Sequence, residues 1–422
     1  MKKSILFIIG VVFFASGLFA GGLKESDETI LRIGSASNGP GAIAVFDAVM
    51  VEFEETHPGV KVTWDRSAGD DYEFSGLPSL LQSNDSPDIY FEWGGARVKN
   101  HYLDGEAMDI SDLAAQLAPS MNQSAWSGSV FDGKTYMIPM THDITIQIWY
   151  NQDIFDELGL SVPTDWDDFM TLNDAIVAAG KTPLVMGNAD AWVTGNFIGL
   201  FLYRMAGDDK ANSILNLEKG TSLDDPDFVK ALQYAYDMAV KGHFNADMNT
   251  LGYEESFSRM FDGSSVMYPL GAWYTDEVVG LMGLNFDDVN QDYFMLPPFP
   301  DGKGSSSSVL GLNTGYMINS KTEKKELAYE FLTLLMSDKY QLDMANTGNL
   351  STVSSAMAED DEYLQRYSAT LKNASAIVAP PDTGYNLEMA FALYEAIAKV
   401  SAGLVTPEEA LAVAEASIKH LR

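Results

Sequence analysis

The sequence has 422 residues, 46% of them hydrophobic, which is too long for one compact core and predicts two domains or lobes that each bury their own. Its 60 acidic and 26 basic residues give a net charge of −34, and such a surface repels nucleic acid and anionic lipid, so we expect neither as a partner. No cysteine is present, which excludes disulfides, thiolate catalysis, cysteine-ligated metals and lipidation through a cysteine.

Residues 1–20 have the pattern of a signal peptide. Lys2 and Lys3 supply a positive start, an apolar run follows at 5–14, and small residues lead up to Ala20. Because a membrane-spanning helix needs roughly 20 apolar residues, the run is too short for an anchor. We therefore expect cleavage near Ala20 and an exported, periplasmic protein that is not lipid-anchored through a cysteine.

Strand and helix patterns then alternate. The chain predicts strands at 30–33, 60–64 and 88–91, separated by helices at 43–53 and 76–82. This βαβαβ order indicates a parallel sheet with helices on both faces. Ligands of such sheets bind beyond the carboxyl ends of the strands. The loops after Ile33, after Phe91 and around 140–143 are therefore the places where we expect function.

The rest of the chain is mainly helical in pattern from 153 to about 261. Helices are predicted at 197–205, 228–240 and 327–335, and one opens at 165 with Thr164 as its N-cap. A stretch rich in Pro, Gly and Ser at 297–308 indicates a surface loop. The last helix begins at Thr406, which is followed by proline and two glutamates, the order typical of a capped first turn.

Several short segments match the pattern of a known protein family. Each match is weak alone, but their order along the chain is specific. They are Phe53–Val62, Ser86–Tyr90, Asp132–Pro139 with Trp149–Phe155, Leu158–Trp166, Phe261–Gly263 with Gly271–Trp273, Asn319–Leu335 with Thr347–Leu350, and Thr406–Leu411. Taken together, they resemble the family 1 extracellular solute-binding proteins of ABC importers, the sugar-binding group that contains maltose-binding protein. The resemblance covers essentially the whole chain after residue 20.

The resemblance implies the fold. We expect an α/β, two-lobed periplasmic binding protein fold, with parallel-core sheets flanked by helices and a hinge of crossing segments. It places an N-terminal lobe at 29–142 and 316–349, a C-terminal lobe at 145–313 and 353–422, and crossings near 142–145, 313–316 and 349–353. It also implies that a saccharide binds between the lobes, that closure follows, and that a permease of the ABC transporter receives the sugar. We expect a monomer with no enzymatic activity, no cofactor and no metal.

Sugars present hydroxyls and flat C–H faces, so a site needs hydrogen-bonding side chains and aromatic rings. Trp93, Trp192 and Trp273 lie in polar or Gly-rich contexts and are candidates for stacking, with simple core positions as the alternative. The polar candidates are Asn38, Glu92, Asp143, Tyr385 and Asn386. The resemblance implies the roles of Asp143, near a ligand-binding acid of the family, and of Tyr385 and Asn386, in a late loop that lines the cleft. For all of them the alternative is an ordinary turn or capping residue.

Two other functions stay open. A secreted glycoside hydrolase would need a pair of carboxylates, and adjacent acids occur at Asp70-Asp71, Asp167-Asp168 and Asp360-Asp361. In so acidic a chain such pairs need no special explanation. A binding protein for a non-sugar solute, such as a polyamine or a metal, would suit the acidity. The five histidines, however, show no metal-ligand spacing.

Overall fold

The computed structural model describes residues 28–36, 39–67, 71–357 and 361–422. The predicted signal peptide lies outside these residues. The chain opens with β1 (Thr29–Ala36), α1 (Pro40–Thr56) and β2 (Val60–Ser67), and it reaches β3 (Ile89–Trp93) through a π-helical turn at Tyr72–Gly76 and α3 (Leu77–Leu81). β1 pairs in parallel with both β2 and β3, so the predicted βαβαβ unit is confirmed.

This first sheet also contains strands from much later in the chain. Its order is β12-β11-β3-β1-β2, with β6 paired to β11. The long strand β11 (Val309–Ile318) runs antiparallel to β3 and to β6 (Ile138–Ile144), and parallel to the short β12 (Ile377–Val378). The sheet is therefore mixed rather than purely parallel. Its first three strands are parallel, as predicted, but β11 enters from the opposite end and runs antiparallel to β3.

A second sheet has the order β10-β7-β9-β8. β7 (Gln147–Asn151) lies antiparallel between β9 (Ser265–Leu270) and β10 (Gln291–Phe294), and β8 (Thr182–Leu184) runs parallel to β9. A two-stranded hairpin, β4 (Val130–Phe131) with β5 (Lys134–Thr135), lies apart from both sheets. Each large sheet thus anchors its own group of helices.

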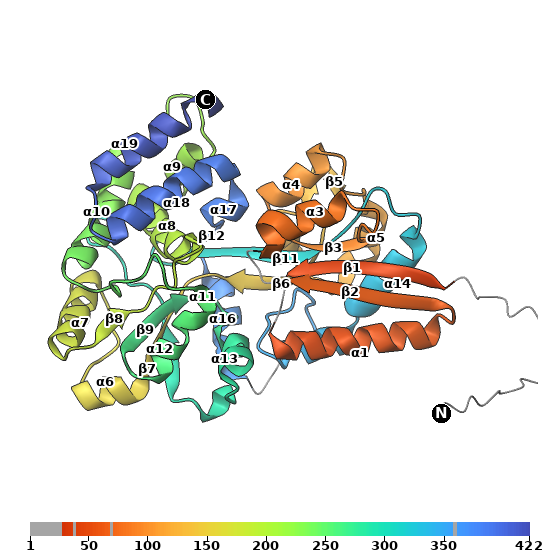
Figure 1. The fold of residues 1–422 in the computed structure, drawn as a ribbon, viewed down its shortest axis with the longest axis horizontal. Coiled ribbons are helices and arrows are strands. Elements are labelled where there is room, and N and C mark those ends of the chain that lie inside the picture. Colours follow the sequence, from red (N-terminus) through yellow and green to blue (C-terminus); the bar gives the residue numbers. More distant parts are fainter. Residues whose placement is uncertain (1–27, 37–38, 68–70, 358–360) are drawn as a thin grey trace, which may run out of the picture.

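Figure 1 shows the two groups side by side, with β6 and β11 running between them. The first group adds α4 (Ala96–Leu103), α5 (Ser111–Leu117), α14 (Lys325–Leu335) and α15 (Asp338–Ala345). The second group has α6 (Gln152–Leu158), α7 (Trp166–Ala178), α8 (Trp192–Ala206), α9 (Asp208–Leu215), α10 (Pro226–Val240), α11 (Tyr253–Ser256), α12 (Ser258–Phe261), α13 (Tyr274–Met282), α16 (Glu362–Asn373), α17 (Pro381–Gly384), α18 (Leu387–Ser401) and α19 (Pro407–Ser417).

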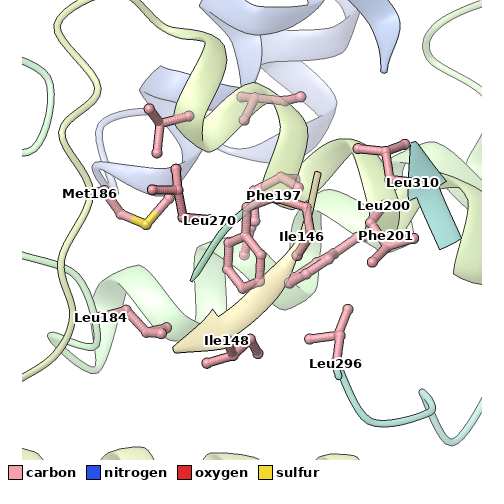
Figure 2. Packing of buried hydrophobic residues seen from close by; sticks show 14 of the residues in the cluster. Ile146, Ile148, Leu184, Met186, Phe197, Leu200, Phe201, Leu270, Leu296 and Leu310 are labelled. Carbon is pink, nitrogen blue, oxygen red and sulfur yellow. The ribbon is translucent and has the colours of Figure 1, made fainter. Parts of the chain in front are cut away.

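Each group buries a separate hydrophobic core. The first core draws on β1, α1, β3 and α14, with Ile33, Phe46 and Phe331 fully buried. The second core is larger and surrounds α8, whose Phe197 and Phe201 pack among the strands of the second sheet (Figure 2). Two separate cores of this size are what the chain length predicts.

Helix starts depend on capping side chains. Thr406 accepts a hydrogen bond from the backbone N–H of Glu409 and caps α19, as predicted. The prediction of Thr164 as the cap of α7 is wrong, because Asp165 accepts the bond from the N–H of Asp168. Thr164 instead donates its hydroxyl to the carboxylate of Asp168. α8 begins at Trp192, earlier than the apolar pattern from 197 indicated.

Three segments run side by side between the two cores. β6 pairs with β11 from Ile138 to Ile144, and the segment around Ser351 joins the free edge of β6. Backbone bonds of 2.8 Å from His142 N to Leu350 O and 3.0 Å from Thr352 N to Met140 O hold this segment in place. Among the described residues, no helix has the length and apolar character needed to cross a membrane.

The buried carboxylate of Asp88 ties the first sheet to the loop after β11. It accepts hydrogen bonds from the backbone N–H of Arg32 (2.8 Å), from the hydroxyl of Thr322 and from Nζ of Lys324 (2.9 Å).

We predict that Asp88→Ala lowers the free energy of unfolding by about 2–3 kcal/mol, because these donors lose their acceptor. Asp85→Ala is the control, since its carboxylate is 81% exposed and bonds Arg32 at the surface; we expect less than about 0.5 kcal/mol. Urea unfolding of both variants measures the difference, and equal losses would contradict the prediction.

Candidate functional site

One face of the first sheet carries polar and aromatic side chains where β3, β11 and β6 meet. Trp93 pairs with Thr314, and Thr314 pairs with Thr141. Asp143 lies two residues beyond Thr141 on β6. Because paired residues share a face and side chains alternate along a strand, these four side chains lie on the same face. Trp93 itself is partly exposed and packs its edge against Phe91, with ring centroids 4.9 Å apart.

The Asp143 carboxylate is partly withdrawn from water. Burial raises its pKa to about 7, and a hydrogen bond from Thr314 opposes that shift. The hydroxyl of Thr314 lies 2.6 Å from that of Thr141, so the acid stands at the end of a short chain of hydroxyls. Such a carboxylate can accept hydrogen bonds from a neutral, hydroxyl-bearing ligand.

Three aromatic rings from the second group of elements form a cluster, which we call the aromatic group: Trp192, Tyr253 and Trp273. Trp192 begins α8, Tyr253 begins α11, and Trp273 directly precedes α13. The ring of Trp192 lies 5.1 Å from that of Tyr253 and 6.2 Å from that of Trp273. All three side chains are partly exposed, so the group presents aromatic surface to solvent.

Hydrogen bonds fix the orientation of the aromatic group. Nε1 of Trp273 donates to the hydroxyl of Tyr253 at 3.0 Å, and the same hydroxyl bonds the carboxylate of Glu277. Burial, together with the charges of Asp276 and Glu254, raises the pKa of Glu277 to about 7. The indole of Trp273 also lies directly over Gly271, where a Cβ would come within 1.9 Å of the ring.

Tyr253 is not among the site residues predicted from the sequence. Its context, Gly252-Tyr253-Glu254, is the same kind of glycine-rich polar setting that singled out the three tryptophans. A tyrosine in such a setting can stack on a sugar as a tryptophan can, so the same signal indicates Tyr253.

A backbone hydrogen bond joins the segment that carries Trp273 to the strand that carries Asp143. The β7–β9 ladder continues past its ends through a bond of 2.9 Å from Ala272 N to Ile144 O. Asp143 and Trp273 each stand one residue beyond that bond. Their backbones are therefore neighbours, although 130 residues separate them in the sequence. Trp93, Asp143 and the aromatic group make up the candidate site.

Glu92 is not brought together with Trp93. It points to the opposite face of β3, where it is 2% exposed, and its carboxylate bonds Nε2 of His101 at 2.8 Å and the N–H of Trp93. The other ring nitrogen of His101 lies 2.7 Å from Glu106. Burial opposes protonation of His101, but the bonds to Glu92 and Glu106 outweigh it and raise the pKa of the imidazole. The structure gives Glu92 a place in this buried ion-pair network.

Tyr385 lies beside Tyr203, near the end of α8 opposite to Trp192. Tyr385 is 6% exposed, and its hydroxyl bonds that of Tyr203 at 2.6 Å and the side chain of Asn212 inside the second core. Asn386 is exposed and caps α18 by accepting a bond from the N–H of Met389. Both positions correspond to the core and capping alternatives. Asn38 lies outside the described residues, as do Asp70 and Asp360.

The remaining acidic pair has an ordinary structural role. Asp167 and Asp168 stand in the first turn of α7, where negative charge is favourable. In the described part of the chain, no three His, Asp or Glu side chains are placed to hold a metal ion.

The model of the bacterial extracellular solute-binding protein family matches residues 35–342. The chain belongs to this family. The family match confirms the resemblance seen in the sequence. Members of this family are binding proteins that act outside the cell membrane, which confirms the expectation of a binding protein rather than an enzyme.

Relatives of this solute-binding protein include an uncharacterised ABC transporter extracellular-binding protein of Pyrococcus horikoshii, 26% identical over 71% of this chain and 74% of the relative. Another is the diacetylchitobiose binding protein DasA of Streptomyces coelicolor, 25% identical over 73% of this chain and 68% of the relative. A solved chitin oligosaccharide binding protein superposes with a TM-score of 0.82 at 19% identity, over 93% of this chain and 99% of that chain. These likenesses confirm the two-lobed α/β fold.

The pKa of Asp143 gives the stability of this solute-binding protein a pH dependence. An aspartate in the unfolded chain ionises near pH ~3.9, whereas in the folded protein it does so at about 7. The folded state therefore binds more protons, and the contribution of Asp143 to stability falls as the pH rises through this window.

We predict that Asp143→Asn raises the melting temperature at pH 8 and that the gain shrinks at pH 5. Asp85→Asn, at the exposed surface, is the control; a gain for Asp143→Asn that is equal at both pH values would contradict the prediction.

Proposed function

We propose that this solute-binding protein captures a sugar between its two lobes and delivers it to the permease of an ABC importer. The observation that carries the proposal is the aromatic group beside Asp143. Partly exposed aromatic rings offer surfaces on which the C–H face of a pyranose can stack. The neighbouring carboxylate can accept bonds from the hydroxyls at the rim of the same sugar.

The names of several relatives support a saccharide ligand. One is a multiple sugar-binding protein of Streptococcus mutans, 27% identical over 42% of this chain and 48% of the relative. The relative from Streptomyces coelicolor binds diacetylchitobiose. A solved bacterial solute receptor that is similar in fold has an exclusive substrate preference for β-D-galactopyranose. These ligands differ in size, so they support the class of ligand and leave its length to experiment.

We assign the lobes with the bounds that the resemblance implies. The two cores support this division, except that Val353 and Ala356 pack in the first core and Ala345 packs in the second. The N-terminal lobe comprises 29–142 and 316–349, and the C-terminal lobe comprises 145–313 and 353–422. The boundaries fall at the three side-by-side segments, which would act as the hinge. Within the site, we assign ligand contact to Trp93, Asp143, Trp192 and Trp273, and add Tyr253. The buried network around Glu92 and the core position of Tyr385 favour structural roles for those two.

The protein would work as an exported monomer. Residues 1–20 would direct export and be removed near Ala20, and the absence of cysteine favours a protein that is free in the periplasm. N-terminal sequencing of material released by osmotic shock tests this proposal. A chain that keeps its first 20 residues and stays with the membrane would contradict it.

The first test of function is a thermal-shift screen. We predict that chitin oligosaccharides, xylo-oligosaccharides or galactose, at saturating concentration, raise the melting temperature, because a ligand that binds only the folded state stabilises it. Chromatography after prolonged incubation should return the sugar unchanged. Spermidine belongs in the same screen, since stabilisation by spermidine alone would favour the non-sugar alternative. Release of a shortened sugar would favour the hydrolase.

The second test concerns the aromatic group and uses whichever sugar the screen identifies. We predict that Trp273→Ala weakens binding by about 1–3 kcal/mol, the value of a large aromatic contact, and barely changes the stability of the free protein. Trp166→Ala is the matched control, because Trp166 is 4% exposed in the second core. It should cost about 3–5 kcal/mol of stability while the folded fraction keeps its affinity. Calorimetric titration beside melting curves separates the two. Normal binding by Trp273→Ala would remove this residue from the site.

A further inference from the structure

The N-terminus of α1 lies against α13, although the two helices belong to different cores. Phe46 and Val49 of α1 are buried in the first core, whereas Tyr274 and Val278 of α13 are buried in the second. Figure 1 shows the beginning of α1 next to α13, beside the strands that join the two groups. The position of one helix relative to the other is therefore set by how the lobes are rotated about the crossing segments.

The first turn of α1 has no cap of its own. Its N-cap residue is Gly39, which has no side chain, and the first N–H groups of a helix have no partner within it. The carboxylate of Asp276, on α13, supplies the cap from the other lobe. Its Oδ1 accepts from the N–H of Gly41 at 3.3 Å, and the N–H of Ala42 and the side chain of Asn349 also bond the carboxylate. Asp276 is 8% exposed in this arrangement.

The contact is close enough to require glycine on both helices. A Cβ at Gly39 would lie 2.1 Å from Oδ2 of Asp276, and one at Gly41 would lie 2.6 Å from Cβ of Thr347. On the facing helix, a Cβ at Gly280 would lie 2.8 Å from Cδ of Pro40. Glycine at positions 39 and 280 thus allows the two helices to approach, which a chance contact between two surfaces would not need, and Gly41 fits against Thr347 of its own lobe.

A second contact between the lobes involves α4 and α17. Arg97 on α4 is 6% exposed, and Asp382 on α17 is 7% exposed. Burial raises the pKa of Asp382, and the positive charge of Arg97 opposes that shift. A Cβ at Gly95 would lie 3.1 Å from the carbonyl oxygen of Thr383. The lobes therefore touch through α4 and α17 as well as through α1 and α13.

We propose that Asp276 is a closure residue: its carboxylate caps α1 only when the lobes are together, and so it sets the balance between the open and closed forms without touching the ligand. When the lobes separate, the N–H groups of Gly41 and Ala42 lose this acceptor and Asp276 returns to water. Burial raises the pKa of Asp276, and the hydrogen bonds from Gly41, Asn349 and Ala42 oppose that shift. The stabilisation of the closed form comes from the acceptor that Asp276 gives to the first N–H groups of α1, which have no partner within the helix. Contacts within the protein would then supply part of the free energy of closure, so less of the binding free energy of the ligand is needed to close the lobes.

The absence of cysteine allows a direct test without any ligand. Leu103→Cys on the first lobe and Leu404→Cys on the second introduce two labelling sites, at positions 63% and 71% exposed. Nitroxide labels on both then report the distance between the lobes by pulsed electron paramagnetic resonance. In the labelled parent we expect a closed population with a short distance. Asp276→Ala should lower the ratio of closed to open protein about tenfold, the loss expected for a hydrogen-bonded charge. Asp276→Asn keeps an acceptor oxygen and should retain most of the closed form.

The matched control is Asp165→Ala. Asp165 is also a carboxylate that caps a helix, but it accepts from the N–H of Asp168 within one lobe, at 2.9 Å. Its loss should lower the melting temperature and leave the distance distribution unchanged. Gly39→Ala is an independent second variant, because its Cβ must displace the carboxylate, and it decides the matter if Asp276→Ala does not fold. The proposal is overturned if the parent shows no short-distance population, or if neither Asp276→Ala nor Gly39→Ala reduces it. Since no sugar is added, the result does not depend on the proposed ligand.

Discussion

The arrangement of the whole molecule depends on one strand, β11, which is shared between the two cores. Its first residues, Val309 and Leu310, are buried in the second core, and its last, Tyr316 to Ile318, are buried in the first. Between these ends it pairs with β3 on one side and β6 on the other. The backbone ladder, whose register shifts once between Thr314 and Gly315, connects the two lobes while their helices pack in separate cores. Rotation about this strand is the motion that such a connection permits.

Because side chains alternate along a strand, the same ladder determines which residues reach the site. Asp143 and Trp93 share a face, whereas their chain neighbours His142 and Glu92 point the other way. His142 lies 2.6 Å from Oδ1 of Asn313, and burial lowers the pKa of its ring in spite of that bond. The neutral histidine and the paired Glu92 stabilise the back of the sheet, which leaves Asp143 and Trp93 free to face a ligand.

Periodicity and local chemistry were enough to predict much of this. A short apolar run located β1, alternating apolar residues located β2, the Thr406 cap located α19, and polar surroundings singled out Trp192 and Trp273. The same reasoning could not place Tyr385, whose partner Tyr203 is distant in sequence and close only after α8 and α17 have packed together. It likewise gave no sign of Asp276, which meets Gly41 across 235 positions. Contacts of this kind follow from tertiary packing, and no local pattern records them.

The two acids of the site, Asp143 and Glu277, are suited to hydrogen bonds from neutral hydroxyl groups. Burial raises the pKa of both Asp143 and Glu277 to about 7, and the negative charges of Asp276 and Glu254 add to the shift of Glu277. Each acid has one hydroxyl partner from the protein, Thr314 for Asp143 and Tyr253 for Glu277. A carboxylate has acceptor capacity for several such bonds, so each retains unused capacity in a partly desolvated place. Sugar hydroxyls are the neutral donors that match this capacity, and the rings of Trp273 and Trp192 lie next to it. The site thus withholds water from its carboxylates by burial, and a hydroxyl-rich ligand restores the hydrogen bonds that burial removed.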